Sequence, residues 1–233
     1  MALPNHETKR IVRPRDLFLN AALAATAWTP SLSQSTPRLG FIGGANLATL
    51  TSTFIQNASN RIGFAVGLMA VLPVSPSFAI QPELMFTMKG TNSKPGGPDA
   101  KAKIDYIELP VLARFQMRAF GRVKPFVYGG PGFAYWTNCT IEGHTIEQNV
   151  ARRAIKMDCD SLARQAAQAV PGAKFSRTDV DGIIGGGLAF DVRGRTMTVG
   201  VRYDVGFVKL INYSDSKNRA LSFMGTLDWP FHK

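Results

Sequence analysis

The C-terminal segment Leu221–Phe231 limits most strongly what this chain can form. Its large apolar residues share one parity, and they are Leu221, Phe223, Leu227, Trp229 and Phe231. The other parity is mostly polar, with Ser222, Thr226 and Asp228. A period of two predicts a strand, and its length suits a tilted membrane-crossing strand of about 9–11 residues that ends in interfacial aromatic side chains. If the apolar face meets lipid, the chain forms an outer-membrane barrel; if it meets a core, the chain forms a soluble β-protein.

Seven earlier segments show the same alternation, so each is predicted to be a strand. Their approximate bounds are 38–50, 61–72, 78–89, 104–117, 123–136, 180–192 and 197–208. In the fifth of these the phase is ambiguous, because Val127 and Phe133 disagree with Phe126 and Tyr128. Short and long connections alternate, as they do in up-and-down barrels with short periplasmic turns and longer outer loops. The sequence therefore predicts an all-β fold, an eight-stranded antiparallel up-and-down transmembrane β-barrel, with both chain ends periplasmic.

The N-terminus has the features of a secretory signal peptide over residues 1–27. A basic start precedes the short Ala-rich stretch Leu17–Ala27, and Ala25-Thr26-Ala27 offers a cleavage site. We expect a short periplasmic segment at 28–37 and one outer-membrane barrel domain at 38–233. The formal net charge of +11 favours anionic surroundings. Outer-membrane lipid and lipopolysaccharide are the expected partners, whereas nucleic acid is not, because no basic helix with interleaved aromatic residues is present.

Charged residues recur on the parity opposite the large apolar side chains, and we expect them to form a structural network inside the barrel. They are Glu83, Lys89, Glu108, Arg114, Arg202, Asp204 and Asp228. In lipid this parity must face the lumen, where side chains fill a small barrel and opposite charges pair. Glu83 and Glu108 are expected to meet Arg114 and Arg202, since neighbouring strands place same-face residues side by side. A catalytic carboxylate site is the alternative interpretation.

The segment from Thr137 to Asp179 is predicted to be one unusually long loop. It holds Cys139 and Cys159, which could close a disulfide in an oxidising compartment and which do not form a zinc site alone. Residues 160–170 have helical composition with an acidic start, followed by Pro171-Gly172. This segment is either a solvated excursion or a binding element, through which a protein partner could dock.

No catalytic, cofactor or metal motif is apparent. The three histidines, His6, His144 and His232, have no neighbouring arrangement of serine and acid, and neither G-x-S-x-G nor H-E-x-x-H occurs. The glycines around 40–44 and 182–187 lie within continuing alternation instead of opening a helix. They are therefore expected to give room for curvature or for large neighbours, and not to bind phosphate.

Several short motifs resemble those of the PorT-like outer-membrane β-barrel proteins. The segment Tyr106–Leu112 is the most specific of them, and the others are Gly40–Leu50, Gln81–Leu84 with Lys89-Gly90, Pro125–Gly132, Asp181-Gly182, Arg202-Tyr203 and Lys217-Asn218. The resemblance implies an eight-stranded barrel in the outer membrane of a Gram-negative cell. It also implies a link to secretion machinery for the family's named member, but no functional residues to transfer.

Together these observations predict a small outer-membrane barrel with a filled polar lumen and a structural, adhesive or secretion-accessory role, without catalysis or a cofactor. Two other functions remain open. A soluble lipocalin-like ligand-binding barrel would turn its apolar residues inward. A lipid-modifying barrel enzyme would assemble a catalytic site in space, which no linear motif would reveal.

Overall fold

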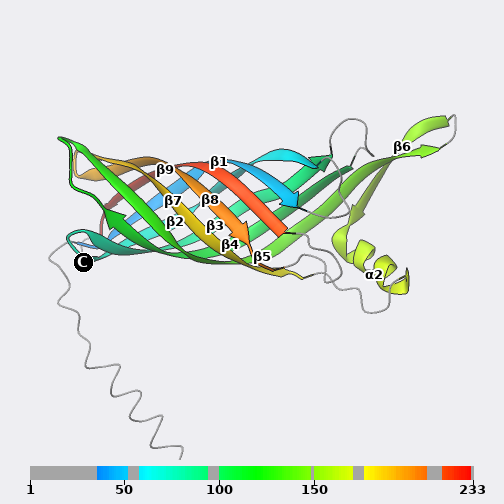
Figure 1. The fold of residues 1–233 in the computed structure, drawn as a ribbon, viewed down its shortest axis with the longest axis horizontal. Coiled ribbons are helices and arrows are strands. Elements are labelled where there is room, and N and C mark those ends of the chain that lie inside the picture. Colours follow the sequence, from blue (N-terminus) through cyan, green and yellow to red (C-terminus); the bar gives the residue numbers. More distant parts are fainter. Residues whose placement is uncertain are drawn as a thin grey trace, which may run out of the picture.

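The chain forms a closed antiparallel β-barrel with an extension at one end (Figure 1). The computed structural model describes residues 36–51, 58–93, 100–147, 150–169, 176–208 and 217–231. Its strands are β1 (Arg38–Thr51), β2 (Ala58–Ser75), β3 (Phe78–Ser93), β4 (Ala100–Gln116), β5 (Val123–Glu147), β6 (Val150–Asp158), β7 (Thr178–Val192), β8 (Arg195–Gly206) and β9 (Lys217–Pro230), and α2 spans Cys159–Ala169. The predicted signal peptide at 1–27 lies outside the described residues.

Eight strands close the barrel, in the order β1-β2-β3-β4-β5-β7-β8-β9, with β9 paired back to β1. The prediction of an eight-stranded antiparallel barrel is therefore confirmed. The connections at one end are short, and in the β7–β8 turn both Arg193 and Gly194 have positive φ, as a two-residue type I′ hairpin requires. Both Arg38 and Pro230 lie at this end, where they pair with each other. We call it the short-turn end and the opposite one the long-loop end.

The predicted long connection between the fifth barrel strand and the next is present and contains a helix, but the hairpin in its first part was not predicted. Strand β5 continues to Glu147 and pairs with β6, which lies outside the closed barrel, and α2 follows directly. In Figure 1 the β5–β6 hairpin and α2 project from the long-loop end. Sequence alternation did not reveal this hairpin, because β6 lies outside the closed barrel wall whose two faces impose the alternation. We call residues 137–169 the extension.

The outer surface of the barrel is apolar. Exposed large side chains come from every barrel strand and include Phe41, Phe64, Leu84, Leu109, Val111, Val127, Ile184, Val199, Tyr203, Phe223 and Trp229. The rings of Phe41 and Trp229 lie 5.6 Å apart on adjacent strands near the short-turn end. In a lipocalin-like barrel these residues would fill the interior. Their exposure therefore excludes that alternative, because water would contact a continuous apolar belt.

The structure resolves the ambiguous phase of β5, and a glycine on the neighbouring strand gives room to one of its inward side chains. Phe126 and Tyr128 are buried and point inward, whereas Val127 and Phe133 are exposed. Tyr128 pairs in register with Gly185 on β7, and a Cβ at Gly185 would lie 2.6 Å from the Cζ atom of Tyr128. The glycine thus leaves space for an aromatic ring in a narrow lumen.

No helix among the described residues is long and apolar enough to cross a membrane.

Candidate functional site

The centre of the barrel is crossed by an ion pair between Glu83 and Arg202. Both carboxylate oxygens of Glu83 accept hydrogen bonds of 2.7 Å from Nη2 of Arg202. Strands β3 and β8 are not neighbours in the sheet, so the pair joins opposite walls of the lumen. The guanidinium also lies 5.4 Å from the centre of the Tyr128 ring. Glu83 was predicted to meet an arginine, and it does. The prediction assumed adjacent strands, however, and the arginine lies across the barrel.

The long-loop half of the lumen contains one lysine among several acids. Nζ of Lys89 lies 2.7 Å from Oε1 of Glu108 and 3.2 Å from Oδ2 of Asp181. The expected meeting of Glu108 with an arginine was wrong, because the lysine on the neighbouring strand is closer to it. Asp204 also interacts electrostatically with Lys89, yet its Oδ1 atom is buried without a hydrogen-bond partner among the described residues.

Asp179 adds another carboxylate to this half. Its Oδ1 accepts hydrogen bonds from the backbone N–H groups of Val180 and Val208, at 2.8 and 3.1 Å. Its neighbour Asn218 donates a 2.8 Å hydrogen bond to the hydroxyl of Tyr106. The long-loop half is therefore rich in acids, and it is closed by the buried side chains of Ile104, Tyr106 and Trp136.

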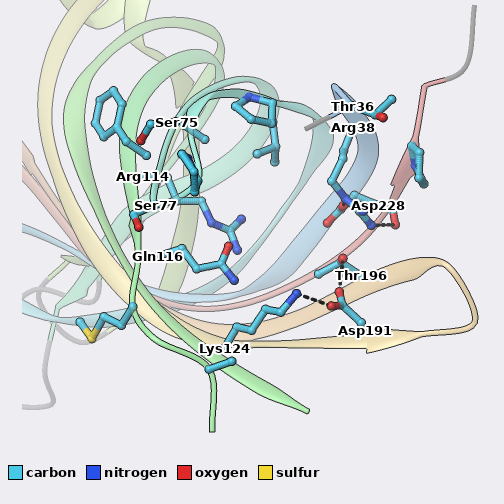
Figure 2. A pocket seen from close by; sticks show the side chains of 18 of the residues that line it. Thr36, Arg38, Ser75, Ser77, Arg114, Gln116, Lys124, Asp191, Thr196 and Asp228 are labelled. Carbon is cyan, nitrogen blue, oxygen red and sulfur yellow. Dashed lines mark hydrogen bonds and ion pairs between the residues drawn. The ribbon is translucent and has the colours of Figure 1, made fainter. Parts of the chain in front are cut away.

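The short-turn half contains Arg114, Arg38 and Asp228, and it opens into a vestibule (Figure 2). Nη1 of Arg114 donates a 3.0 Å hydrogen bond to Oε1 of Gln81, whose Nε2 donates a 2.7 Å bond to Glu83. Arg38 pairs with Asp228. The expected contact of Arg114 with a glutamate is thus indirect, because the neutral Gln81 amide lies between them.

All seven predicted lumen residues lie inside the barrel, but they form several groups instead of one network. Sequence reasoning missed Arg38, Gln81, Asp179 and Asp181, which complete these groups. Parity could have identified Asp179 and Asp181, since they share a face with the buried Ile183. Among the described residues, no group of three or more His, Cys, Asp or Glu side chains is arranged to hold a metal ion.

A disulfide and an arginine hold the extension near the barrel. Cys139 on β5 and Cys159 at the start of α2 form the disulfide, and their Cα atoms are 5.4 Å apart. Arg177 donates hydrogen bonds of 2.7 and 2.8 Å to the carboxylate of Asp160 in α2, and its guanidinium lies 5.0 Å from the Trp136 ring centre. Hydrogen bonds from Ser161 lower the pKa of Asp158, which caps the helix N-terminus.

Comparison with known proteins agrees with this architecture. Residues 32–212 match the family model described as the outer membrane protein beta-barrel domain. The chain belongs to this family. An outer-membrane location follows for the barrel. No curated protein matches the sequence significantly.

Solved structures similar to this family member include several small barrels. Neisserial surface protein A shares 11% identity, with coverage of 83% of this chain and 97% of that one and a TM-score of 0.45. Ail from Yersinia pestis shares 10% identity, with coverage of 84% and 100% and a TM-score of 0.43. OprG from Pseudomonas aeruginosa shares 10% identity, with coverage of 86% and 98% and a TM-score of 0.44.

Proposed function

We propose that this small outer-membrane barrel is a contact protein, in which the closed barrel anchors the extension at the cell surface. The observation that carries the proposal is the β5–β6 hairpin. Strand β5 runs past its neighbour β7 beyond Tyr135 and past β4 beyond Gly143, and over residues 140–147 β6 takes the place of β7 as its partner. The disulfide and the Arg177–Asp160 pair fix the base of the projection. Such a fixed projection loses less conformational entropy on binding than a free loop would.

The filled lumen supports an anchoring role over a transport role. The Glu83–Arg202 pair joins opposite walls, and both side chains are almost fully buried. Because buried ion pairs are costly to separate, the pair obstructs the path that solutes would need. In planar bilayers we expect no conductance comparable to that of a wide general porin. A stable conductance of that size in the wild-type protein would contradict the proposal.

The basic residues at the long-loop end favour a partner with an anionic surface. Lys101, Lys156 and Arg164 are exposed there. Lys103 pairs with Glu142 at 2.7 Å, and this contact helps to lower the pKa of the Glu142 carboxyl. Lipopolysaccharide of the same membrane and an acidic protein partner both offer suitable anions. The proposed orientation places the long-loop end outside the cell and both termini in the periplasm, after removal of a signal peptide at 1–27.

A secretion-accessory role is the second form of this proposal, and it depends on the narrower PorT-like resemblance of Tyr106–Leu112 and the other motifs. Both forms use the barrel without catalysis. The absence of catalysis can be tested by mass spectrometry of lipid A from cells with and without the protein. A change in lipid A that depends on the protein would assign it an enzymatic activity.

Shortening the hairpin tests the contact role. Replacing residues 143–155 by Asn-Gly removes the tip, keeps both cysteines and supplies a two-residue turn. Heat-modifiable gel mobility verifies that the barrel still folds. We expect cells carrying this variant to lose adhesion to surfaces coated with lipopolysaccharide or an acidic protein, or to lose secretion of outer-membrane cargo. Loss of adhesion favours the adhesive form, and loss of secretion favours the accessory form. If both processes remain at wild-type levels, the contact role is wrong.

A further inference from the structure

The short-turn end of the lumen contains a cavity that the contact function does not use. Its volume is about 890 Å³, which lies within the range of small-molecule sites in proteins. The cavity lies between the ends of the barrel strands, and Figure 2 shows Arg114, Gln116, Lys124 and Asp228 around it. It is the opposite end of the molecule from the extension. Any ligand of this cavity is therefore recognised independently of the contact surface.

Two of the basic residues that line the cavity are already neutralised. Arg38 pairs with Asp228, and Lys124 pairs with Asp191, which also accepts a 2.7 Å hydrogen bond from Thr196. Figure 2 shows both acid–base pairs at the wall of the cavity. Each of the two lining acids thus has its own ion-pair partner.

Of the other two lining cations, Arg118 is exposed, whereas Arg114 is almost completely buried. Its residue is 5% exposed, yet no carboxylate of the described residues lies within ion-pair distance of its guanidinium. Among the described residues it has one hydrogen bond, the 3.0 Å contact with the Gln81 amide oxygen, and the Phe126 ring covers one face at 3.9 Å. A guanidinium has five N–H donors, so most of them remain for a ligand or for water.

The cavity combines this unneutralised charge with an apolar wall. Val71, Pro73 and Ala79 line it, and Gln116 lies two residues beyond Arg114 on the same face of β4. In Figure 2 the guanidinium of Arg114 points into the cavity, with the Gln116 amide beside it. A planar guanidinium binds carboxylates with two parallel hydrogen bonds, and burial strengthens such a pair.

We propose that this vestibule binds a small organic carboxylate, with the carboxylate on Arg114 and the apolar body against Val71, Pro73 and Ala79. Arg114 is the one buried lining cation without an ion pair among the described residues, and one guanidinium matches one carboxylate group. A phosphate dianion would bring a second negative charge towards Asp228 and Asp191, which disfavours it. A free small acid and the C-terminal carboxylate of a peptide offer the same chemistry.

Fluorescence titration of the full-length protein in a neutral detergent tests the site. The probe is dansylglycine, and dansylamide is its matched control because it lacks the carboxylate. We expect saturable binding of dansylglycine and at least about tenfold weaker binding of dansylamide, equivalent to about 1.4 kcal/mol. Arg114→Gln should weaken dansylglycine binding by at least about tenfold, whereas Arg195→Gln, which lies outside the cavity, should leave it unchanged. Equal binding of both probes, or no effect of Arg114→Gln, overturns the proposal.

A second variant keeps the test decisive if Arg114→Gln fails to fold. Gln116→Glu keeps the buried arginine and places a carboxylate beside it, so the same loss of dansylglycine binding is expected. A folded Gln116→Glu protein with wild-type affinity overturns the proposal.

Competition experiments identify the source of the carboxylate. Displacement of dansylglycine by acetylglycine alone indicates a free small acid. Displacement also by a tetrapeptide with a free C-terminus, but not by its amidated form, indicates a chain end. Both results support a carboxylate site. Stronger displacement by inorganic phosphate than by acetylglycine, or displacement by none of these compounds, contradicts it. The hairpin-shortened protein should bind dansylglycine normally, so the failure of one proposal does not affect the other.

Discussion

In the long-loop half of the lumen Lys89 lies among the carboxylates of Glu108 and Asp181, whereas in the short-turn half no carboxylate of the described residues lies within ion-pair distance of the Arg114 guanidinium. The first half is closed by buried aromatic side chains, and the second opens into a vestibule. Both halves are built by the same inward parity of the same strands. Alternation therefore decides that a charge is buried, but the packing at each end decides how that charge is balanced.

The difference also indicates where each half obtains its compensation. In the closed half Glu108 and Asp181 share Lys89, and Asp179 accepts hydrogen bonds from backbone N–H donors. In the open half, solvent or a ligand can reach the unpaired cation. The Glu83–Arg202 pair separates the two halves, because it crosses the barrel between them. Substitutions in the three regions should consequently differ in size and in sign.

The largest effect is expected for Arg202→Met at the centre. It leaves the buried Glu83 carboxylate without its cation, so the free energy of unfolding should fall by about 3–5 kcal/mol. Urea unfolding in lipid vesicles, followed by tryptophan fluorescence, measures this change. The exposed Arg195→Gln on the same strand is the control, with an expected change within about 0.5 kcal/mol. The double variant with Glu83→Met should recover most of the stability. A persistent loss in the double variant would mean that packing, and not charge, accounts for the effect.

In the closed half, Lys89→Met should destabilise the barrel by about 3 kcal/mol, because it removes the cation that Glu108 and Asp181 share. The same unfolding measurement applies. Lys103→Met is the matched control, since Lys103 is a half-exposed lysine at the same end and its pair with Glu142 is solvated. It should cost less than about 1 kcal/mol. Equal losses in the two lysine variants would show that burial of the pair is unimportant.

The sequence predicts much of this architecture because alternation determines which face of a strand is buried. A shift of one residue would expose every lumen charge to lipid, so the parity of Glu83, Arg114 and Arg202 is strongly constrained. Partners are a different matter. Glu83 meets Arg202 from a strand on the other side of the barrel, and such a contact depends on closure and register that no local pattern contains.

The extension and the vestibule could not be predicted for related reasons. Beyond Tyr135 strand β5 leaves β7 and then pairs with β6, which lies outside the closed barrel, so the alternation of the barrel wall does not extend to β6. Arg114 and Arg202 both lie on the inward face of their strands, so the sequence pattern cannot show that only Arg202 has a carboxylate within ion-pair distance. Only the structure shows that a neutral Gln81 amide separates Arg114 from Glu83.

In the open half, Asp228→Asn should destabilise the barrel by about 1–2 kcal/mol, since it breaks the pair with Arg38, which is partly exposed. It should also tighten dansylglycine binding, because the vestibule loses a negative charge near Arg114. Asp191→Asn, at the exposed rim, should lower stability by less than about 1 kcal/mol. Unfolding measurements and probe titrations on the two variants test both statements. Weaker binding to the Asp228→Asn protein would contradict the assigned charge balance of the vestibule.

The smallest expected effect has the opposite sign and belongs to the closed half. Asp204→Asn removes a buried charge whose Oδ1 atom lacks a hydrogen-bond partner among the described residues, in a region where acids exceed cations. The free energy of unfolding should therefore rise by up to about 1 kcal/mol. The same substitution in the Lys89→Met background should give a larger gain, because repulsion among the remaining acids is then unopposed. A loss of stability in either background would show that Asp204 serves mainly to balance Lys89 and Arg202, and that the closed half does not contain surplus negative charge.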